Sequence, residues 1–298
     1  MSRTRAFLIV VVAYVLAGTA AVGTGILFHS QAPIVIVALA DLVATIVVFI
    51  FSVITDNSSM YDPYWSVAPV FIALFWLLQP SSNGFVNPRH VLIFALVCLW
   101  AIRLTSNWAM QWRGLSHQDW RYVDIQKQTG SMYWPVSFVG IHLMPTILVF
   151  LGSLALWPTL SGRNTGITWL DIVAALVTLT AVIIEGTADL QMRRFRSKAE
   201  SEKRVIPPGL WSVSRHPNYF GEVLFWWGLY LFVPLAHPNF WWAIVGPVAI
   251  LLLFLGVSIP LMERHLLAGH PTYVEYQQRV SPFFPWFHTE RIWGQVIR

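Results

Sequence analysis

Residues 209–228, with the sequence GLWSVSRHPNYFGEVLFWWG, carry polar side chains into the start of an apolar stretch. Pro217 suits the first turn of a helix, because its missing N–H would have no partner there. The free N–H groups and positive dipole end of a helix start attract anions, and Arg215 adds a planar guanidinium that matches phosphate oxygens. Asn218 and Glu222 lie deeper, where they can hydrogen-bond a carboxamide or hydroxyl groups. The stretch therefore predicts a site for a large anionic cofactor whose neutral end reaches into the membrane.

Three other apolar stretches also carry polar residues at helical spacing, which keeps each set on one helix face. The four sets are Trp100, Arg103 and Asn107; Glu185, Asp189, Arg193 and Arg196; Asn218, Glu222 and Trp226; and Glu263 at the end of IPLMERH. Ionisable residues in membrane spans are costly and usually face a cavity or a partner. We therefore expect the four sets to meet in one pocket near the cytosol. The alternatives are salt bridges between helices, such as Glu185 with Arg103, and a lipid-headgroup anchor formed by Arg215 and His216.

The segment TDNSSMYDPYWS (55–66) adds acids and tyrosines at a similar depth. Desolvation disfavours the charge of a carboxylate at membrane depth, so we expect Asp62 to stay protonated. A neutral acid in an apolar site can donate a hydrogen bond to a carbonyl oxygen, and Tyr64 would assist it. The alternative is an Asx turn that Asp62 forms before Pro63.

The composition indicates that lipid surrounds the elements that position these residues. The chain has 298 residues, of which 56% are hydrophobic and 11% are charged, against roughly 25% charged residues in soluble domains. Apolar runs of about 20 residues recur along the chain, each long enough to cross a bilayer. We predict an all-α, polytopic transmembrane bundle of about seven to nine spans. The predicted helices are 6–29, 33–54, 66–80, 90–110, 134–157, 167–190, 217–236 and 239–261.

One membrane domain, residues 1–298, accounts for the whole chain, since no polar block is large enough to fold separately. The N-terminal run with Arg3 and Arg5 is read as an uncleaved first helix, because its apolar part is too long for a signal peptide. If the N-terminus, with Arg3 and Arg5, is cytosolic, most of the other basic residues also lie on the cytosolic side. These are Arg113, Arg121, Lys127, the 193–215 cluster with Lys198, Lys203 and Arg204, and Arg264, Arg279, Arg291 and Arg298. The outer loops would hold Arg89 and Arg163. This bias predicts that both termini are cytosolic.

Several other classes of protein are excluded or disfavoured. The net charge of +5 and the pI of about 9.6 follow from this topology, so no nucleic-acid partner is expected. The single cysteine, Cys98, excludes a disulfide framework. The nine histidines are scattered without ligand spacing, and no metal site is predicted. No GxxxxGK or GxGxxG motif occurs, so neither a P-loop enzyme nor a Rossmann domain is supported.

Two C-terminal motifs of the chain resemble those of a known family. The stretch GLWSVSRHPNYFGEVLFWWGLYLF, followed by SIPLMERHLLAGHPTYVEYQQRVSPFFPWF, resembles the C-terminal domain of the steroid 5-alpha-reductase family. The stretches NSSMYDPYWSVAP and RGLSHQDWRYVDI are similar to those of its bacterial membrane-protein branch. The resemblance covers residues 56–288, which we treat as a reductase-like core that follows N-terminal spans at 1–55. Isoprenylcysteine-type methyltransferases and sterol reductases share the C-terminal motif.

The resemblance implies an NADPH pocket that faces the cytosol, a cavity open to a lipid-soluble substrate, and a location in the bacterial inner membrane. The implied cofactor-binding residues are Arg103, Asn107, Glu185, Asp189, Arg193, Arg196, Arg215, His216, Asn218, Tyr219, Glu222, Trp226, Glu263 and Tyr273. The family holds the substrate carbonyl with a glutamate and a tyrosine, whose positions correspond here to Asp62 and Trp100. With Trp100 in place of the tyrosine, Tyr64 or Tyr61 is expected to supply the missing hydroxyl.

Three functions remain as hypotheses. The first is an NADPH-dependent reductase of a C=C bond conjugated to a carbonyl in a lipid-soluble substrate. The second is a membrane methyltransferase that uses S-adenosylmethionine, although Arg264 follows Glu263 where that group has a second glutamate. The third is a transporter or lipid-binding protein, which the absence of internal repeats disfavours.

Overall fold

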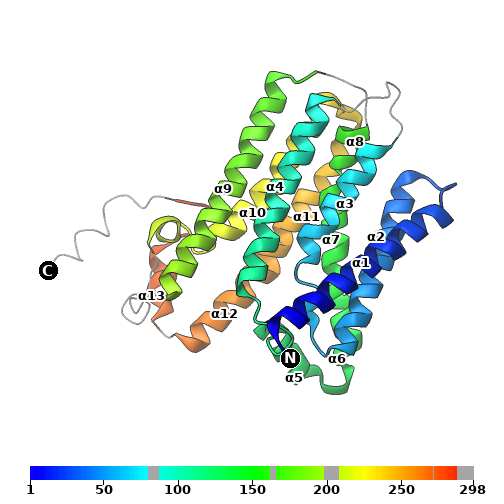
Figure 1. Ribbon diagram of the computed structural model, residues 1–298. Coiled ribbons are helices and arrows are strands. Elements are labelled where there is room, and N and C mark those ends of the chain that lie inside the picture. The colour runs from blue at the N-terminus through cyan, green and yellow to red at the C-terminus, as the bar shows by residue number, and fades with distance from the viewer. Residues whose placement is uncertain (80–86, 162–165, 198–207, 271, 287–298) are drawn as a thin grey trace. The chain divides into compact units, whose positions relative to one another are not determined.

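The computed structural model describes residues 1–79, 87–161, 166–197, 208–270 and 272–286 (Figure 1). Within these ranges the chain is helical and contains no strand, which confirms the predicted all-α bundle. Seven helical stretches in the described ranges are long and apolar enough to cross a membrane. They are Arg3–Leu27, Pro33–Ile54, Ser58–Leu78, Pro88–Gln111, Trp120–Ser153, Trp169–Arg196 and Pro238–Gly269. The protein is therefore a multi-pass, membrane-type helical protein; the cytosolic placement of its termini stays a prediction.

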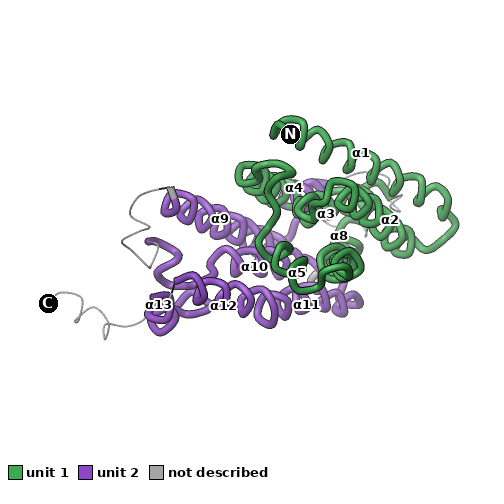
Figure 2. The backbone as a smooth tube through the Cα atoms, turned by 90° about the horizontal axis from the view of Figure 1, so that it is seen from below, with its two compact units in different colours: residues 1–84, 97–161 green, residues 85–96, 162–298 purple. Residues whose placement is uncertain are grey.

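The chain divides into two compact units, which Figure 2 colours separately. Unit 1 comprises residues 1–84 and 97–161, and unit 2 comprises residues 85–96 and 162–298. The basic residues Arg163, Lys198, Lys203, Arg204, Arg291 and Arg298, which entered the topology prediction, lie outside the described ranges.

Unit 1 is built from the first half of the chain. Its helices are α1 (Arg3–Leu27), α2 (Pro33–Ile54), α3 (Tyr64–Leu78), the second part of α4 (Pro88–Gln111), α5 (Trp120–Thr129), α6 (Tyr133–Ser137), α7 (Met144–Ser153) and α8 (Leu156–Ser161). Ser2 caps α1 by accepting a hydrogen bond from the Arg5 N–H, and Pro33 begins α2, where it needs no donor. The helices α1 and α2 pack against each other along the blue part of the chain in Figure 1.

The predicted helix 134–157 is interrupted. A π-helical turn, Phe138–Leu143, joins α6 to α7, and the backbone turns again at residues 154–155 before α8. Pro145 is the second residue after the π-helical turn, in the first turn of α7. Proline lacks an N–H, so the wider turn before it accommodates the lost bond within one continuous helical stretch.

The connection between α2 and α3 is buried within unit 1. Residues Asn57 to Tyr61 are each at most 1% exposed, although only the short turn Ser58–Met60 is helical there. Asp56 reverses the chain with φ at +49°, and Asn57 Nδ2 donates to the carbonyls of Leu115 and His117. Non-helical backbone at membrane depth persists only where protein partners satisfy it. These contacts supply such partners.

Unit 2 contains the first part of α4, together with α9 (Trp169–Ser197), α10 (Pro217–Ala236), α11 (Val245–Leu253), α12 (Ile259–Gly269) and α13 (Tyr273–Arg279). A second π-helical turn, Phe254–Ser258, joins α11 to α12. The predicted helix 217–236 is α10, and the predicted helix 239–261 extends through α12 to Gly269.

The tightest helix pair of unit 2 is α9 with α10. A Cβ on Gly221 would lie 2.7 Å from Glu185 Cβ, and one on Gly228 would lie 2.9 Å from Thr178 Cα. Both glycines therefore allow the backbones to approach closely, as small residues do in membrane helix pairs. This packing lays the polar stripe of α9 beside that of α10.

A buried ion pair fixes the start of α4 within unit 2. Arg89 Nε lies 2.8 Å from Asp171 Oδ1, with side-chain exposures of 1% and 4%. Arg89 Nη2 also donates to the carbonyl of Phe232, while Thr168 donates to Asp171 Oδ2. The extra hydrogen bonds offset part of the cost of burying both charges.

Candidate functional site

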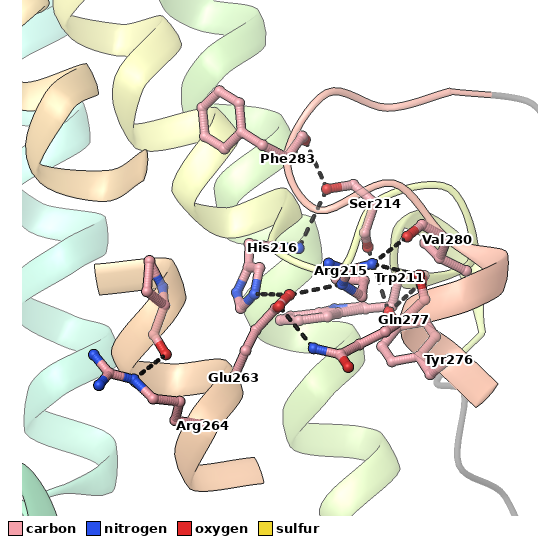
Figure 3. A network of polar contacts seen from close by, with 11 residues as sticks. Trp211, Ser214, Arg215, His216, Glu263, Arg264, Tyr276, Gln277, Val280 and Phe283 are labelled. Carbon is pink, nitrogen blue, oxygen red and sulfur yellow. Dashed lines mark hydrogen bonds and ion pairs between the residues drawn. The ribbon is translucent and has the colours of Figure 1, made fainter. Parts of the chain in front are cut away.

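A network of side-chain hydrogen bonds converges at the entrance to α10, in unit 2 (Figure 3). Arg215 is 8% exposed, and its Nε donates to Glu263 Oε1 at 2.7 Å. Its Nη1 donates to the carbonyls of Gln277 and Val280, at the end of α13. Arg215 thus caps α13 as well as pairing with α12, since a cation near the last carbonyls of a helix stabilises them.

Glu263 accepts from three residues at this entrance. Besides Arg215, His216 Nε2 donates to Glu263 Oε1 at 3.2 Å, and Gln277 Nε2 donates to Glu263 Oε2 at 2.8 Å. Figure 3 shows these groups converging on the carboxylate, while the neighbouring Arg264 points away and donates to the Pro260 carbonyl. The network holds the first turn of α10 in a fixed position.

A C-terminal strap, residues 280–286, covers the segment that leads into α10. The Arg215 N–H donates to the Ser281 carbonyl at 2.8 Å, and the Trp286 N–H donates to the Val213 carbonyl at 3.0 Å. Ser214 Oγ donates to the carbonyl of Phe283. These bonds satisfy the backbone of the approach to α10, so its direction is set by the tail of the chain.

The same approach is tied to α9. Trp211 Nε1 donates to the Ala188 carbonyl at 2.9 Å, and the Leu210 N–H donates to Gln191 Oε1 at 2.9 Å. Gly209, with φ at +80°, packs directly on the Gln191 side chain, where another residue would be strained. The approach therefore lies at the level of Asp189 on α9.

The polar stripe of α10 is largely buried. Glu222 is 6% exposed, and its Oε1 accepts from Trp226 Nε1 at 2.9 Å. Asn218 is half-buried, and its Oδ1 is enclosed without a hydrogen-bond partner. Buried amide oxygens nearly always accept a hydrogen bond in native proteins, so this atom is suited to a ligand donor.

Aromatic residues border the same entrance. The His216 ring stacks on Tyr219, with centroids 5.2 Å apart and planes 7° apart. Tyr273, on α13, is 6% exposed, and burial raises the pKa of its phenol, as does the nearby charge of Glu263. Tyr273 therefore stays neutral and keeps its O–H as a donor.

The structure places the predicted cofactor residues in both units. Unit 2 holds Glu185, Asp189, Arg193, Arg196, Arg215, His216, Asn218, Tyr219, Glu222, Trp226, Glu263 and Tyr273. Within this set, Arg215, His216 and Glu263 are joined directly, and the α9 and α10 stripes pack side by side. Arg196 lies exposed at the end of α9. Unit 1 holds Arg103 and Asn107 on α4, and their convergence with the unit 2 set stays a prediction.

The predicted catalytic residues Asp62, Tyr64 and Trp100 lie in unit 1, but Asp62 and Tyr64 form hydrogen bonds with different partners. Asp62 Oδ1 accepts from Tyr122 Oη at 2.7 Å, whereas Tyr64 Oη donates to Asp41 Oδ1 at 2.6 Å. Trp100 is completely buried on α4. Asp62 and Tyr64 thus do not share a partner through any of these bonds.

Sequence reasoning missed three partners, namely Asp41, Tyr122 and Gln277. Of these three residues, only Asp41 stands out in the sequence, because an acid in the middle of an otherwise apolar span is costly. Tyr122 and Gln277 look like ordinary interfacial residues in the sequence, and only folding brings them to Asp62 and Glu263.

The arrangement in unit 2 suits the binding of an organic anion more than the binding of a metal ion. Among the described residues, no group of three or more histidine, cysteine, aspartate or glutamate side chains is placed to hold a metal. The described entrance instead offers a fixed helix start, arginines on α9 and an unused amide oxygen. These groups recognise phosphate oxygens and polar N–H or O–H groups.

Comparison with known proteins gives a distant relative and a family. An uncharacterized protein of the fission yeast Schizosaccharomyces pombe is 26% identical over 282 residues, which cover 87% of this chain and 81% of the relative. No solved structure matches the chain significantly. Residues 48–280, from the second half of α2 to the residue after α13, match the family described as "Protein of unknown function (DUF1295)". This match includes the buried connection and the α10 entrance, and the chain belongs to that family.

Proposed function

We propose that the protein is a membrane-embedded, NADPH-dependent reductase of a C=C bond conjugated to a carbonyl group in a lipid-soluble substrate. The observation that supports it best is Asn218 Oδ1, an enclosed acceptor without a partner at the fixed start of α10. A carboxamide N–H is the kind of donor that this atom lacks. The likeness of the C-terminal motif to steroid 5-alpha-reductases points to the same cofactor class.

The residues of unit 2 fit a dinucleotide. Arg193 and Arg196 on α9 and the N–H groups at the start of α10 would hold phosphates near the cytosol. Asn218, in the first turn of α10, and Glu222, one turn further along, would hold the carboxamide and hydroxyl groups. When bound, NADPH supplies the hydride. The chain's own residues fix its position and exclude water from the apolar end.

The substrate side of the proposal is assigned to unit 1. Asp62, Tyr64 and Trp100 occupy the segment and helix that the resemblance links to the carbonyl group. A hydrogen bond to the carbonyl oxygen stabilises the enolate that hydride addition creates, because negative charge develops on that oxygen. The lipid-soluble character of the substrate follows from the membrane location of these residues.

The test is a binding comparison with purified protein in lipid nanodiscs. We expect NADPH to bind and S-adenosylmethionine not to bind in isothermal titration calorimetry. Arg193→Gln should raise the Kd for NADPH about tenfold or more, since it removes charge-assisted hydrogen bonds. The matched control is Arg194→Gln, which removes the same charge from an exposed neighbour off the polar stripe. Binding of S-adenosylmethionine in place of NADPH would establish the methyltransferase alternative.

A further inference from the structure

The C-terminal strap presents two large aromatic side chains on the outside of unit 2. Phe284 is 60% exposed and Trp286 is 67% exposed, whereas the neighbouring Phe283 is 2% exposed. Phe283 packs edge-on against Phe220 of α10, with ring centroids 5.6 Å apart. The strap therefore has an inner ring that packs on the helix and two outer rings that do not. Apolar surface left in water is unfavourable in proportion to its area, so the outer rings are suited to a covering partner.

The exposure of the two outer rings is set by a fixed backbone. The Phe283 carbonyl accepts from Ser214 Oγ at 2.7 Å, as Figure 3 shows, and the Trp286 N–H donates to the Val213 carbonyl at 3.0 Å. These bonds lie on both sides of Phe284. The strap cannot turn its outer rings inward without breaking them, so the rings are held outward.

The strap lies at the end of unit 2 where two of its membrane-type spans end. The segment that it covers is bonded to Ala188 and Gln191 in the last turns of α9, and to Glu263 on α12. The spans Trp169–Arg196 and Pro238–Gly269 end a few residues beyond these contacts. Tryptophan is enriched where membrane helices meet the headgroups, and this is the level at which the strap holds its outer rings.

The exposed charges at this end of unit 2 are mainly positive. Within the part of the chain that the structure describes, they are Arg194 and Arg196 on α9, Arg264 on α12, and Glu275 and Arg279 on α13. Glu263, the acid of α12, is directed inward to Arg215. An exposed basic surface at a membrane boundary attracts anionic lipid headgroups, and each arginine adds to the attraction.

The two residues considered from the sequence as a headgroup anchor, Arg215 and His216, are directed inward instead. Their exposures are 8% and 3%, and both contact Glu263. Contact with headgroups at this end of unit 2 is therefore left to the strap and to the exposed arginines around it.

We infer that the C-terminal strap is a membrane-surface anchor, in which Phe284 and Trp286 enter the headgroup region and the neighbouring arginines bind anionic phospholipid. The positive charge around the rings, and their level at the ends of two spans, favour lipid over a protein partner. The inference does not depend on the proposed reductase function.

The anchor has a structural consequence, because the strap also holds the segment that leads into α10. Ser214 and Arg215 are both bonded to strap carbonyls. A strap fixed on the lipid surface keeps these bonds formed, so anionic lipid should stabilise the α10 entrance.

The depth of the strap is tested with nitroxide labels on the full-length protein in a Cys98→Ser background. The protein is placed in nanodiscs of phosphatidylcholine in which about a third of the lipid is phosphatidylglycerol. Labels at Phe284→Cys and Trp286→Cys should collide more with oxygen, which concentrates in lipid, than with a water-soluble nickel chelate. Leu252→Cys, on the exposed side of α11, gives the membrane reference, and His117→Cys, in an exposed loop, gives the water reference. Readings equal to the water reference at both strap positions would overturn the inference and leave the surface to a protein partner.

The lipid dependence is tested by comparing these nanodiscs with nanodiscs of phosphatidylcholine alone. Phosphatidylglycerol should raise the melting temperature of the wild type by about 2–4 °C and slow hydrogen exchange in residues 209–220. Phe284→Ser combined with Trp286→Ser should abolish both differences. Trp241→Ser is the matched control, because Trp241 is 65% exposed near the opposite end of α10 and should keep them.

The charges are tested with the same lipid comparison. Arg264→Gln combined with Arg279→Gln should reduce the gain in melting temperature from phosphatidylglycerol by half or more, whereas Glu275→Gln should enlarge it. Only an electrostatic contact with lipid predicts these opposite changes. A wild type that melts at the same temperature in both lipids, or a gain that survives loss of both outer rings, would contradict the inference. No readout uses NADPH or a substrate, so the result is independent of whether the protein is a reductase.

Discussion

Glu263 is a central acceptor in the hydrogen-bond network at the α10 entrance. Arg215, His216 and Gln277 all donate to it, and its own side chain is 14% exposed. Arg215 is 48 positions away in the sequence, and Gln277 lies on the following helix, so one carboxylate connects three elements. Glu263 therefore stabilises the fold of the α10 entrance, whether or not a ligand is bound there.

Replacing Glu263 with Gln should lower the free energy of unfolding by about 3 kcal/mol, because it leaves the Arg215 guanidinium buried without its counter-charge. Thermal unfolding of the detergent-purified protein measures this effect. Arg264→Gln is the matched control, since Arg264 is exposed and donates to the carbonyl of Pro260 on its own helix, so this variant should unfold like the wild type. Equal melting temperatures for Glu263→Gln and the wild type would show that the network contributes no stability.

The candidate site was predictable in part at the scale of single residues. The Arg-His-Pro-Asn run and the i, i+4 stripes indicated polar groups at one helix start, because helical spacing is a local property. The partner of Arg215 was not predictable in this way, because a guanidinium can bind a phosphate or a carboxylate, and the sequence alone does not show which of the two lies beside it. Likewise Tyr64 was expected to act with Asp62, while the fold gives it Asp41.

At the scale of elements, the closeness of α9 and α10 brings the two polar stripes together. Gly228→Ala should destabilise the protein by about 1–3 kcal/mol, because a methyl group there meets the Thr178 backbone and forces the helices apart. The same replacement at Gly256 is the control, since a Cβ there meets nothing within 4 Å and alanine favours helix. Chemical or thermal unfolding compares the two variants, and a more stable Gly228→Ala would show that the contact is not tight.

The positions of the spans were largely predictable because hydropathy depends only on neighbouring residues. The predicted helix 33–54 agrees with α2, and 217–236 agrees with α10. Breaks within apolar runs were not visible, and the interruption at Phe138–Leu143 depends on how Pro145 is accommodated. The charged end of α9 continued the helix beyond the apolar run, since arginine is a good helix former.

For the whole molecule, the excess of basic residues on alternate connections predicts its orientation. Single cysteines introduced into a Cys98→Ser background should react with a membrane-impermeant maleimide from one side only. Ser2→Cys and His117→Cys should react from the cytosol, and His29→Cys and Gly166→Cys from the outside. All four positions are exposed, so each can be labelled. Labelling of Ser2→Cys from the outside would invert the topology and move the α10 entrance to the other face.

The buried connection between α2 and α3 has a consequence for how the protein is made. Asn57 donates to the carbonyls of Leu115 and His117, and Ser58 contacts Tyr133 and Ser137. A chain still on the ribosome lacks these partners until synthesis has passed residue 137. Until then, the polar connection between α2 and α3 lacks these hydrogen-bond partners, so we expect this stage of synthesis to be the one at which an insertase or chaperone is needed.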